Sequence, residues 1–174
     1  MCDETNDDND LYKYGLIDEK RLRVSVDDWR DIWSWKKCKT RPSYWFKHKP
    51  SYKSQNNYEY YTICINGNHC KLSRVIYKLY NPDWKIEDVS SDNIIDHINV
   101  NSLDNRIENL RILNNQQNQW NNDARGTRFQ KRSGKWSAHL MCNGIRYYGT
   151  SRDTEQEAYE DRLLLKEKYH VLPE

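Results

Sequence analysis

Long apolar runs are missing from this sequence: none approaches the roughly 20 residues that a transmembrane helix needs, which excludes a helical membrane protein. The first ten residues also lack the basic-then-apolar layout of a secretory signal, so we expect an intracellular protein, in a host cytoplasm or a nucleus. None of the five cysteines forms a C-x-x-C pair, which argues against a disulfide framework. Cys64, His69 and Cys70 have the wrong spacing for a zinc knuckle, and buried reduced thiols are the favoured alternative to a zinc site there.

Apolar residues are scarce overall, at 36% of the chain with a mean hydropathy of −1.14. Phenylalanine is nearly absent, with 2 residues, whereas 7 Trp and 13 Tyr raise the aromatic share to 13%. Disordered chains are poor in aromatics, so this composition excludes wholesale disorder. The 174 residues therefore allow one compact domain or two small ones, each with a modest core.

Charge is unevenly distributed along the chain. Residues 1–10 contain five acids and no base, which indicates an acidic disordered tail. Because the whole chain carries a net +2, residues 11–174 carry +7. Residues 32–57 contain seven Lys/Arg and residues 125–149 contain six, in both cases without an acid. Aromatics lie within both stretches, a pattern typical of a nucleic-acid-binding surface; two solvated basic faces are the alternative.

The chain is predicted to have an α+β fold. Its first part contains a hairpin turn at Asn66-Gly67 and a helix over 71–80. A short strand over 93–98 follows, and then a helical stretch from Arg106 to about Trp120. The last part contains three strands and a helix capped by Thr154, which reaches about Tyr169 with Ala158, Leu164, Leu165 and Tyr169 in core positions; the predicted strands are about 127–131, 135–141 and 145–149.

The segment between residues 94 and 122 contains the most informative polar residues. Asp96 and His97 stand together at the end of the predicted strand, and a run rich in asparagine follows. Carboxylate and amide oxygens are the ligands that Mg²⁺ prefers, and a neutral imidazole suits a general base near neutral pH. A metal site with a base facing a polyanion-binding surface describes phosphodiester hydrolysis. A capped turn leading into an asparagine-rich helix is an equally good interpretation of these residues alone.

The complete pattern resembles the HNH endonuclease family, in its phage and giant-virus homing-endonuclease branch. The matching strings are Asp96-His97-Ile98-Asn99, Asp104-Asn105-Arg106-Ile107-Glu108-Asn109-Leu110-Arg111, and Asn118. The resemblance implies a ββα-metal, or His-Me finger, nuclease core over about 93–122. It also implies a single bound Mg²⁺ or Mn²⁺ ion.

By this resemblance, His97 is the general base and Asp96 and Asn118 are the metal ligands. Asn109, the middle letter of the motif, braces the loop and orients His97. Arg106 and Arg111 are expected either to contact phosphate or to pair with nearby acids; the candidate acids are Asp92, Asp104 and Glu108.

The end of the chain, from Arg125 to about Tyr169, resembles the APETALA/ethylene-response-factor DNA-binding domain. The residues that carry the likeness are Gly126-Thr127-Arg128, Ser133-Gly134-Lys135-Trp136-Ser137-Ala138, Gly144-Ile145-Arg146-Tyr147-Tyr148-Gly149-Thr150 and Asp153-Thr154-Glu155-Gln156-Glu157-Ala158. The resemblance implies a three-stranded antiparallel sheet packed on one helix. Such a sheet can lie in the major groove of DNA. The expected DNA-contacting residues are Arg128, Gln130, Arg132, Lys135, Trp136, Arg146 and Tyr148; the alternative for Trp136 is a place in the core between the sheet and the helix.

Together these features predict a site-specific, metal-dependent DNA endonuclease that nicks or cuts double-stranded DNA, as a monomer or a homodimer. The expected organisation is an acidic tail over 1–10, a nuclease domain over 11–122 and a DNA-binding domain over 123–174. The alternatives are a DNA-binding regulator that keeps the fold without cleaving, and a protein that acts on RNA.

Overall fold

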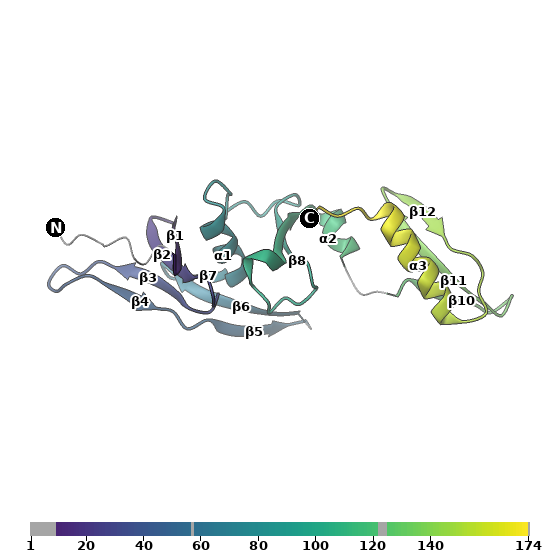
Figure 1. Ribbon diagram of the computed structural model, residues 1–174, viewed down its shortest axis with the longest axis horizontal. Coiled ribbons are helices and arrows are strands. Elements are labelled where there is room, and N and C mark those ends of the chain that lie inside the picture. The colour runs from purple at the N-terminus through teal and green to yellow at the C-terminus, as the bar shows by residue number, and fades with distance from the viewer. Residues whose placement is uncertain (1–9, 57, 122–124, 174) are drawn as a thin grey trace. The chain divides into compact units, whose positions relative to one another are not determined.

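The computed structural model describes residues 10–56, 58–121 and 125–173. Contacts divide the chain into two compact units, of which the first ends at Asn114 and the second begins at Asn115. Both units combine antiparallel strands with few helices (Figure 1). The domain boundary expected at residues 122–123, and residues 1–9 of the expected acidic tail, lie outside the described residues.

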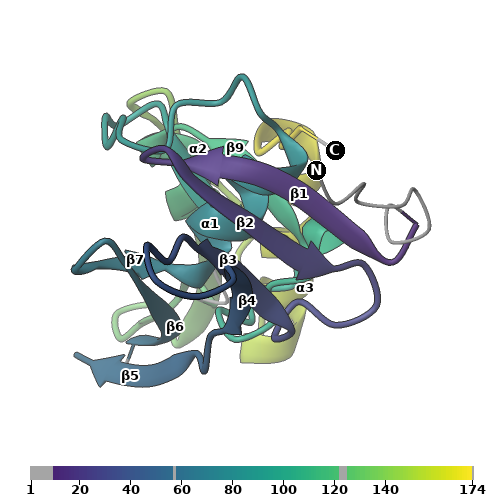
Figure 2. The same ribbon diagram turned by 90° about the vertical axis from the view of Figure 1, so that its left-hand side faces the viewer.

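A four-stranded antiparallel sheet begins the first unit. Its strands lie in chain order, β1 (Tyr12–Ile17), β2 (Lys20–Ser25), β3 (Ile32–Lys36) and β4 (Tyr44–Lys47), as Figure 2 shows. On β2, Leu22 and Val24 are buried while Arg21 and Arg23 alternate onto the other face. This alternation is the period of a strand that covers a core with one face.

A second antiparallel sheet contains β5 (Ser51–Gln55), β6 (Tyr58–Ile65) and β7 (Asn68–Lys71), with β6 in the centre. The hairpin expected at Asn66-Gly67 is confirmed, since these residues link paired β6 and β7 with φ angles of 50° and 86°. Two positive φ angles are what a tight two-residue hairpin turn requires.

The expected helix over 71–80 is confirmed as α1 (Leu72–Tyr80). Its buried apolar residues join the core of the first unit, together with residues from both sheets; on the helix they are Leu72, Val75, Ile76 and Leu79. Each fully buried side chain of this kind contributes about 1.5–3 kcal/mol. Gly15 on β1 permits the close approach, because a Cβ there would lie 2.7 Å from Cδ2 of Leu79.

The helix predicted from Arg106 to about Trp120 is wrong for most of its length. Instead, a short 3₁₀ turn (Ile107–Asn109) leads into β9 (Leu110–Leu113), and only α2 (Asn115–Trp120) is α-helical. Strand β9 pairs antiparallel with β8 (Ile94–His97), which is the strand predicted over 93–98. This pairing satisfies backbone groups of β8 that would otherwise need other partners, and it buries Leu110 and Leu113. Tertiary pairing therefore overrides the local helical spacing.

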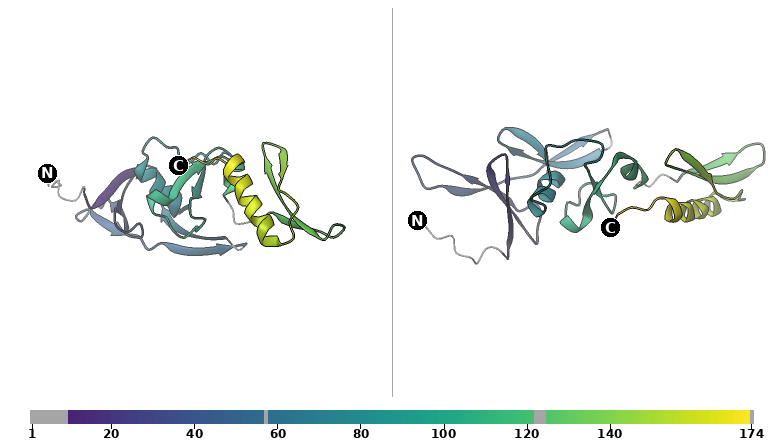
Figure 3. Two further views of the ribbon diagram at one scale, coloured as in Figure 1. Left: turned by 45° about the vertical axis from the view of Figure 1, so that its right-hand side comes forward. Right: turned by 90° about the horizontal axis from the view of Figure 1, so that it is seen from above.

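The second unit contains α2 and a three-stranded antiparallel sheet covered by one helix. The strands are β10 (Thr127–Gln130), β11 (Lys135–Cys142) and β12 (Ile145–Tyr148), within a residue of the predicted ones. Helix α3 (Glu155–Tyr169) lies along the strands, as the yellow helix and green strands of Figure 3 show. The predicted capping box at its start is confirmed, since Thr154 and Glu157 exchange hydrogen bonds.

Of the predicted core positions on α3, only Ala158 is fully buried, while Leu165 and Tyr169 are half-buried and the Tyr169 ring stacks on Tyr147. Leu164 is 64% exposed, and the buried neighbours of Ala158 are the charged residues Asp161 and Arg162. Asp161 accepts two hydrogen bonds from the Arg152 guanidinium, at 2.9 and 2.7 Å, and one from the backbone amide of Thr150. Paired in this way, a carboxylate can take a buried position that hydrophobicity alone assigns to leucine.

Across the described residues, no helix is long and apolar enough to cross a membrane.

Candidate active site

Strands β8 and β9 place the Asp-His pair opposite two residues of the second motif string. The register pairs Asp96 with Arg111 and His97 with Leu110. Nε of Arg111 donates to Oδ2 of Asp96 at 3.0 Å, and these side chains are only 11% and 7% exposed. A buried carboxylate requires such a partner, because desolvating an unpaired charge costs several kcal/mol. Arg111 therefore pairs with none of the three acids considered from the sequence.

His97 is 7% exposed and faces Asn105, which is 1% exposed. Oδ1 of Asn105 lies 3.2 Å from Nε2 of His97, while Nδ2 of Asn105 is within 3.4 Å of the backbone oxygen of Leu103. With the amide nitrogen directed to a carbonyl, the amide oxygen faces the imidazole and can only accept a hydrogen bond. A hydrogen bond across this contact requires Nε2 to carry the ring proton, and in the neutral ring the lone pair that can accept a proton is then on Nδ1.

Electrostatic surroundings favour this neutral form of His97. Burial lowers the pKa of His97, and the positive charge of Lys71 acts in the same direction. The hydrogen bond to Asn105 and the charges of Asp96 and Asp104 oppose that lowering in part, and the pKa remains below its usual value. A neutral imidazole at physiological pH can accept a proton from a reacting group.

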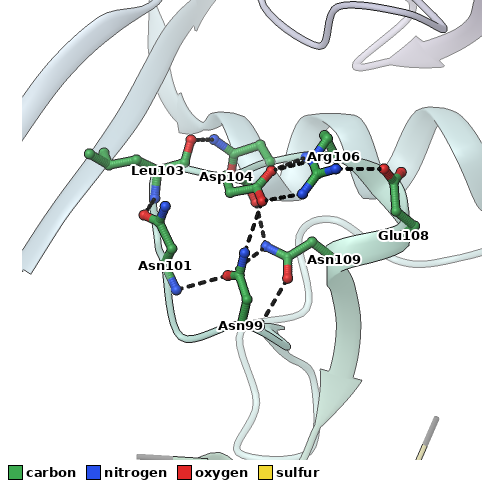
Figure 4. Close-up of polar contacts among 8 residues, drawn as sticks. Asn99, Asn101, Leu103, Asp104, Arg106, Glu108 and Asn109 are labelled. Atoms are coloured by element: carbon green, nitrogen blue, oxygen red, sulfur yellow. Dashed lines mark hydrogen bonds and ion pairs between the residues drawn. The ribbon is translucent and has the colours of Figure 1, made fainter. Parts of the chain in front are cut away.

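Asn109 holds the loop that follows β8, as Figure 4 shows. Its Oδ1 accepts from the backbone amide of Asn99 at 3.0 Å, and its Nδ2 donates to Oδ1 of Asn99 at 3.0 Å and to the backbone oxygen of Asp104 at 2.7 Å. The backbone oxygen of Asn109 also accepts from Ile98 at 2.9 Å. These contacts connect Asn109 to the residues just after His97, whereas the ring of His97 itself contacts Asn105.

One residue of this loop has a strained backbone. Val100 has a φ of 65°, a left-handed conformation that is rare for a β-branched residue. Its amide donates to the backbone oxygen of His97 at 2.9 Å, which closes a tight turn directly after His97. Strain of this kind persists where surrounding contacts determine the backbone, and the Asn99–Asn109 contacts supply them here.

Arg106 is engaged by acids rather than directed away from them. Its Nε and Nη2 donate to the two carboxylate oxygens of Asp104 at 2.9 and 2.8 Å, and Nη1 lies 3.5 Å from Glu108 (Figure 4). The Arg106 hydrogen bonds lower the pKa of Asp104 to about 2. Asp104 and Glu108 are two of the acids considered as partners from the sequence.

Asn118 lies on α2 in the second unit and is half-buried. Its role as a metal ligand stays a prediction. Within the described residues no three His, Cys, Asp or Glu side chains gather where they could hold a metal ion. The four described cysteines are free thiols, but the expectation that they are buried is wrong for Cys64, which is exposed, and Cys70 is only half-buried.

The second unit presents a concave basic face on the side of the sheet opposite α3. The hollow has a volume of about 780 Å³ and its lining includes four Lys/Arg and no acid; the lining residues are Arg128, Phe129, Gln130, Lys131, Arg132, Ser137, His139, Arg146 and Tyr148. Five of the seven residues expected to contact DNA from the sequence lie here. Lys135 instead pairs with Asp153, and Trp136 contacts the Phe129 ring at 5.2 Å beside the buried Ala138.

Sequence reasoning missed several residues of these sites, among them Asn105, His139 and Lys71. Asn105 stands within the matched motif, but its contact with His97 was not foreseen. His139 follows Ser137 by two residues on β11, so strand alternation could have placed it on the basic face. Burial lowers the pKa of His139, and three arginines act in the same direction. Lys71 gave no sequence signal.

Comparison with known proteins gives one finding. Residues 70–120, under a third of the chain, match the family model described as HNH endonuclease. No curated protein and no solved structure matches the chain. The matched segment includes α1, β8, β9 and the loop between these two strands, which we call the motif loop. The segment is similar to a domain that cleaves DNA as a hydrolase.

Proposed function

We propose that this protein is a site-specific, divalent-metal-dependent DNA endonuclease of the homing type. The observation that carries the proposal is the buried, neutral His97 beside Asp96, held by Asn105 inside the segment similar to HNH endonucleases. A neutral imidazole next to a carboxylate suits metal-assisted hydrolysis of a phosphodiester, with the imidazole as general base and the carboxylate as a metal ligand.

The donor chemistry fits a hard divalent cation. Asp96 offers a carboxylate, and Mg²⁺ commonly takes one or two protein oxygens with water and substrate phosphate completing its octahedron. When bound, Mg²⁺ or Mn²⁺ would supply Lewis-acid stabilisation of charge on the phosphate and the leaving oxygen. Arg111 holds the Asp96 carboxylate in one orientation through its 3.0 Å hydrogen bond.

The other site residues prepare the proton transfer. Nδ1 of His97 takes the proton of the attacking water. The Nε2–H group stays hydrogen-bonded to Oδ1 of Asn105, so the imidazolium that forms keeps its orientation. Asn109 fixes the backbone of residues 98–99 and thereby the end of the strand that carries His97. The expected products are a 3′-hydroxyl and a 5′-phosphate.

The second unit supplies DNA recognition in this proposal. Its concave face combines guanidinium groups, an amide and a neutral histidine, which suit both phosphate and base-edge contacts. A three-stranded sheet of this size can enter the major groove, as β-sheet readers do. Sequence preference would therefore come from this unit, and phosphodiester cleavage from the first.

Cleavage of a random-sequence plasmid library in Mg²⁺ or Mn²⁺ tests the proposal. We expect metal-dependent nicking or cutting at an enriched sequence, loss of cleavage in His97→Ala, and retention in His69→Ala, which alters an exposed histidine on β7. Sequence-specific DNA binding without cleavage under any metal condition would favour a DNA-binding regulator instead. In such a protein the Arg111–Asp96 ion pair would keep the carboxylate from binding a metal. Cleavage of RNA alone would change the substrate class.

A further inference from the structure

Lys71 has a position unlike that of the other cations near the motif. It is the last residue of β7 and the N-cap of α1, and it is solvent-exposed. Its Nζ lies 5.1 Å from the ring centroid of Tyr58 and 5.2 Å from that of Tyr60. Two cation–π contacts restrict an ammonium group that would otherwise sample many rotamers.

This cluster of Lys71, Tyr58 and Tyr60 lies next to the motif loop and the strand that carries Asp96 and His97. Oγ of Ser102, in the loop, donates to the backbone oxygen of Glu59 at 2.6 Å, between the two tyrosines. Nη1 of Arg74, one turn along α1, donates at 3.2 Å to the backbone oxygen of Asn93, the residue before β8. These two contacts join β6 and α1, the elements beside the cluster, to the loop after β8 and to the residue before β8.

A pocket of about 140 Å³ opens at this junction. Residues of the cluster, of the first turn of α1 and of β8 line it, among them Tyr58, Lys71, Ser73, Arg74, Ile94 and Ile95. The first turn of α1 has no side-chain cap and no acid, so its amide groups add positive potential to the pocket. The cluster and the site influence each other electrostatically. The positive charge of Lys71 contributes to lowering the pKa of His97, and burial, together with the negative charge of Asp96, raises the pKa of Tyr58.

Lys71 differs from its cationic neighbours in lacking an acid. Arg111 pairs with Asp96, Arg106 pairs with Asp104, and the guanidinium of Arg74 donates to three backbone oxygens. Among the described residues, no carboxylate is within ion-pairing distance of Lys71. An exposed, oriented ammonium beside a catalytic strand is suited to a single anionic group.

We propose that Lys71, held over Tyr58 and Tyr60, is a catalytic-site residue that binds a backbone phosphate of the DNA strand being cut. The site takes a phosphodiester, and the ammonium contributes one ion pair to it. This inference rests on the proposed function for the identity of the ligand, since a nuclease that uses His97 as its base must hold the phosphates next to the bond that it cuts.

The test compares the full-length protein with Lys71→Met, Lys71→Arg and Lys85→Met. Methionine keeps the apolar stem over the tyrosines and removes the charge, arginine keeps the charge, and Lys85 is a matched exposed lysine outside the pocket. Binding of a mixed-sequence duplex is measured against salt in EDTA, with His97→Ala in every chain so that no cleavage occurs. Thermal unfolding verifies that each variant folds.

We expect Lys71→Met to weaken binding and to make the slope of log affinity against log salt shallower by about 0.9, the value for one lost phosphate contact. Lys71→Arg should restore the slope, and Lys85→Met should leave it unchanged. In a cleavage assay with His97 intact, Lys71→Met should lower kcat/KM about tenfold to a hundredfold, as expected for a lost charged hydrogen bond.

A salt slope unchanged in Lys71→Met, or changed equally in Lys85→Met, overturns the phosphate site whether or not the protein cleaves DNA. If the slope falls as expected while the parent protein cleaves no nucleic acid, the phosphate site stands and the proposed nuclease activity fails. If the parent cleaves DNA and Lys71→Met cleaves equally well with an unchanged slope, the activity stands and Lys71 has no part in it.

Discussion

Oδ1 of Asn105 lies 3.2 Å from Nε2 of His97, and both side chains are buried. A buried amide that accepts from one ring nitrogen determines which nitrogen keeps a lone pair, and so which atom can act as the base. In the proposed reaction Asn105 acts through His97, as a positioning residue.

Substituting Asn105 tests this relationship directly. Asn105→Leu removes the acceptor at similar volume, so we expect cleavage to fall about tenfold to a hundredfold and the ring to lose its preference for the Nε2–H form. Nitrogen-15 NMR of the imidazole measures the tautomer. Asn105→Asp retains an acceptor oxygen and should keep the Nε2–H form, while Asn68→Ala, at an exposed hairpin position, serves as the control. An unchanged tautomer in Asn105→Leu would contradict the assignment.

Arg111 is expected to be a stability residue of the first unit. Arg111→Met removes the hydrogen bond and the opposite charge that Arg111 gives the buried Asp96 carboxylate, which should lower the free energy of unfolding by about 3–5 kcal/mol at neutral pH. Urea denaturation measures the loss. The double variant Asp96→Asn/Arg111→Met should recover much of it, because no buried charge then remains unpaired. Equal instability of the double and single variants would show that packing of the arginine stem, and not the charge, is responsible.

Val100 offers the opposite kind of substitution, one expected to stabilise. Left-handed backbone costs a β-branched residue about 1–2 kcal/mol, and glycine avoids this cost while losing about 0.5–1 kcal/mol of unfolded-state entropy. Val100 is 44% exposed, so little burial is lost. We therefore expect Val100→Gly to raise the free energy of unfolding slightly, by up to about 1 kcal/mol. Val89→Gly, at an 83% exposed site without positive φ, should lower stability; identical signs in both would exclude strain at Val100.

Asp104 makes stability depend on pH in the acid range. Its pKa is lowered from 3.8 to about 2 by Arg106. A carboxylate with a depressed folded pKa contributes stability that is fully present above the unfolded pKa and is lost as pH falls through the folded one. The unfolding free energies of the wild type and Asp104→Asn should thus differ most above about pH 4 and converge towards about pH 2. A difference in unfolding free energy that stayed constant over this pH interval would show that Asp104 stabilises the fold by something other than its charge.

The concave face of the second unit should contain both base-reading and phosphate-binding residues. If Arg146 contacts a guanine through two hydrogen bonds, Arg146→Ala should cost about 1–3 kcal/mol on the preferred sequence and relax the preference at one position. Lys131→Ala, at the loop after β10, should weaken binding to all sequences alike and reduce the salt dependence. Competition binding with a panel of single-base variants measures both. Equal weakening across the panel in Arg146→Ala would assign that arginine to phosphate.

Local sequence patterns predicted those elements whose signals lie within a few residues. The Asn66-Gly67 turn needs two left-handed residues, and the Thr154–Glu157 capping box is complete within one helical turn. Strands β10 to β12 are delimited by their own turn residues. Such elements follow from backbone preferences that do not depend on the rest of the chain.

Patterns of the same strength failed where distant segments compete. Leu110 and Leu113 fit one face of a helix as well as a strand, and pairing with β8 selected the strand. On α3, Leu164 was expected in the core but is exposed. Asp161 is buried instead, with its carboxylate hydrogen-bonded to Arg152. In both cases the energy of contacts between segments exceeded the local preference.

The sequence alone was sufficient to select Asp96, His97 and Asn109 as candidate site residues and to indicate basic surfaces, because motif spacing and charge counts need no coordinates. Which partner each side chain has required the folded chain. Asn105 meets His97 because the loop after β8 closes on itself, Arg111 meets Asp96 because β9 pairs with β8, and Lys71 reaches the site because Ser102 ties that loop to β6. These contacts join residues 8, 15 and 43 positions apart, and their geometry is set by packing of the whole unit rather than by neighbours in sequence.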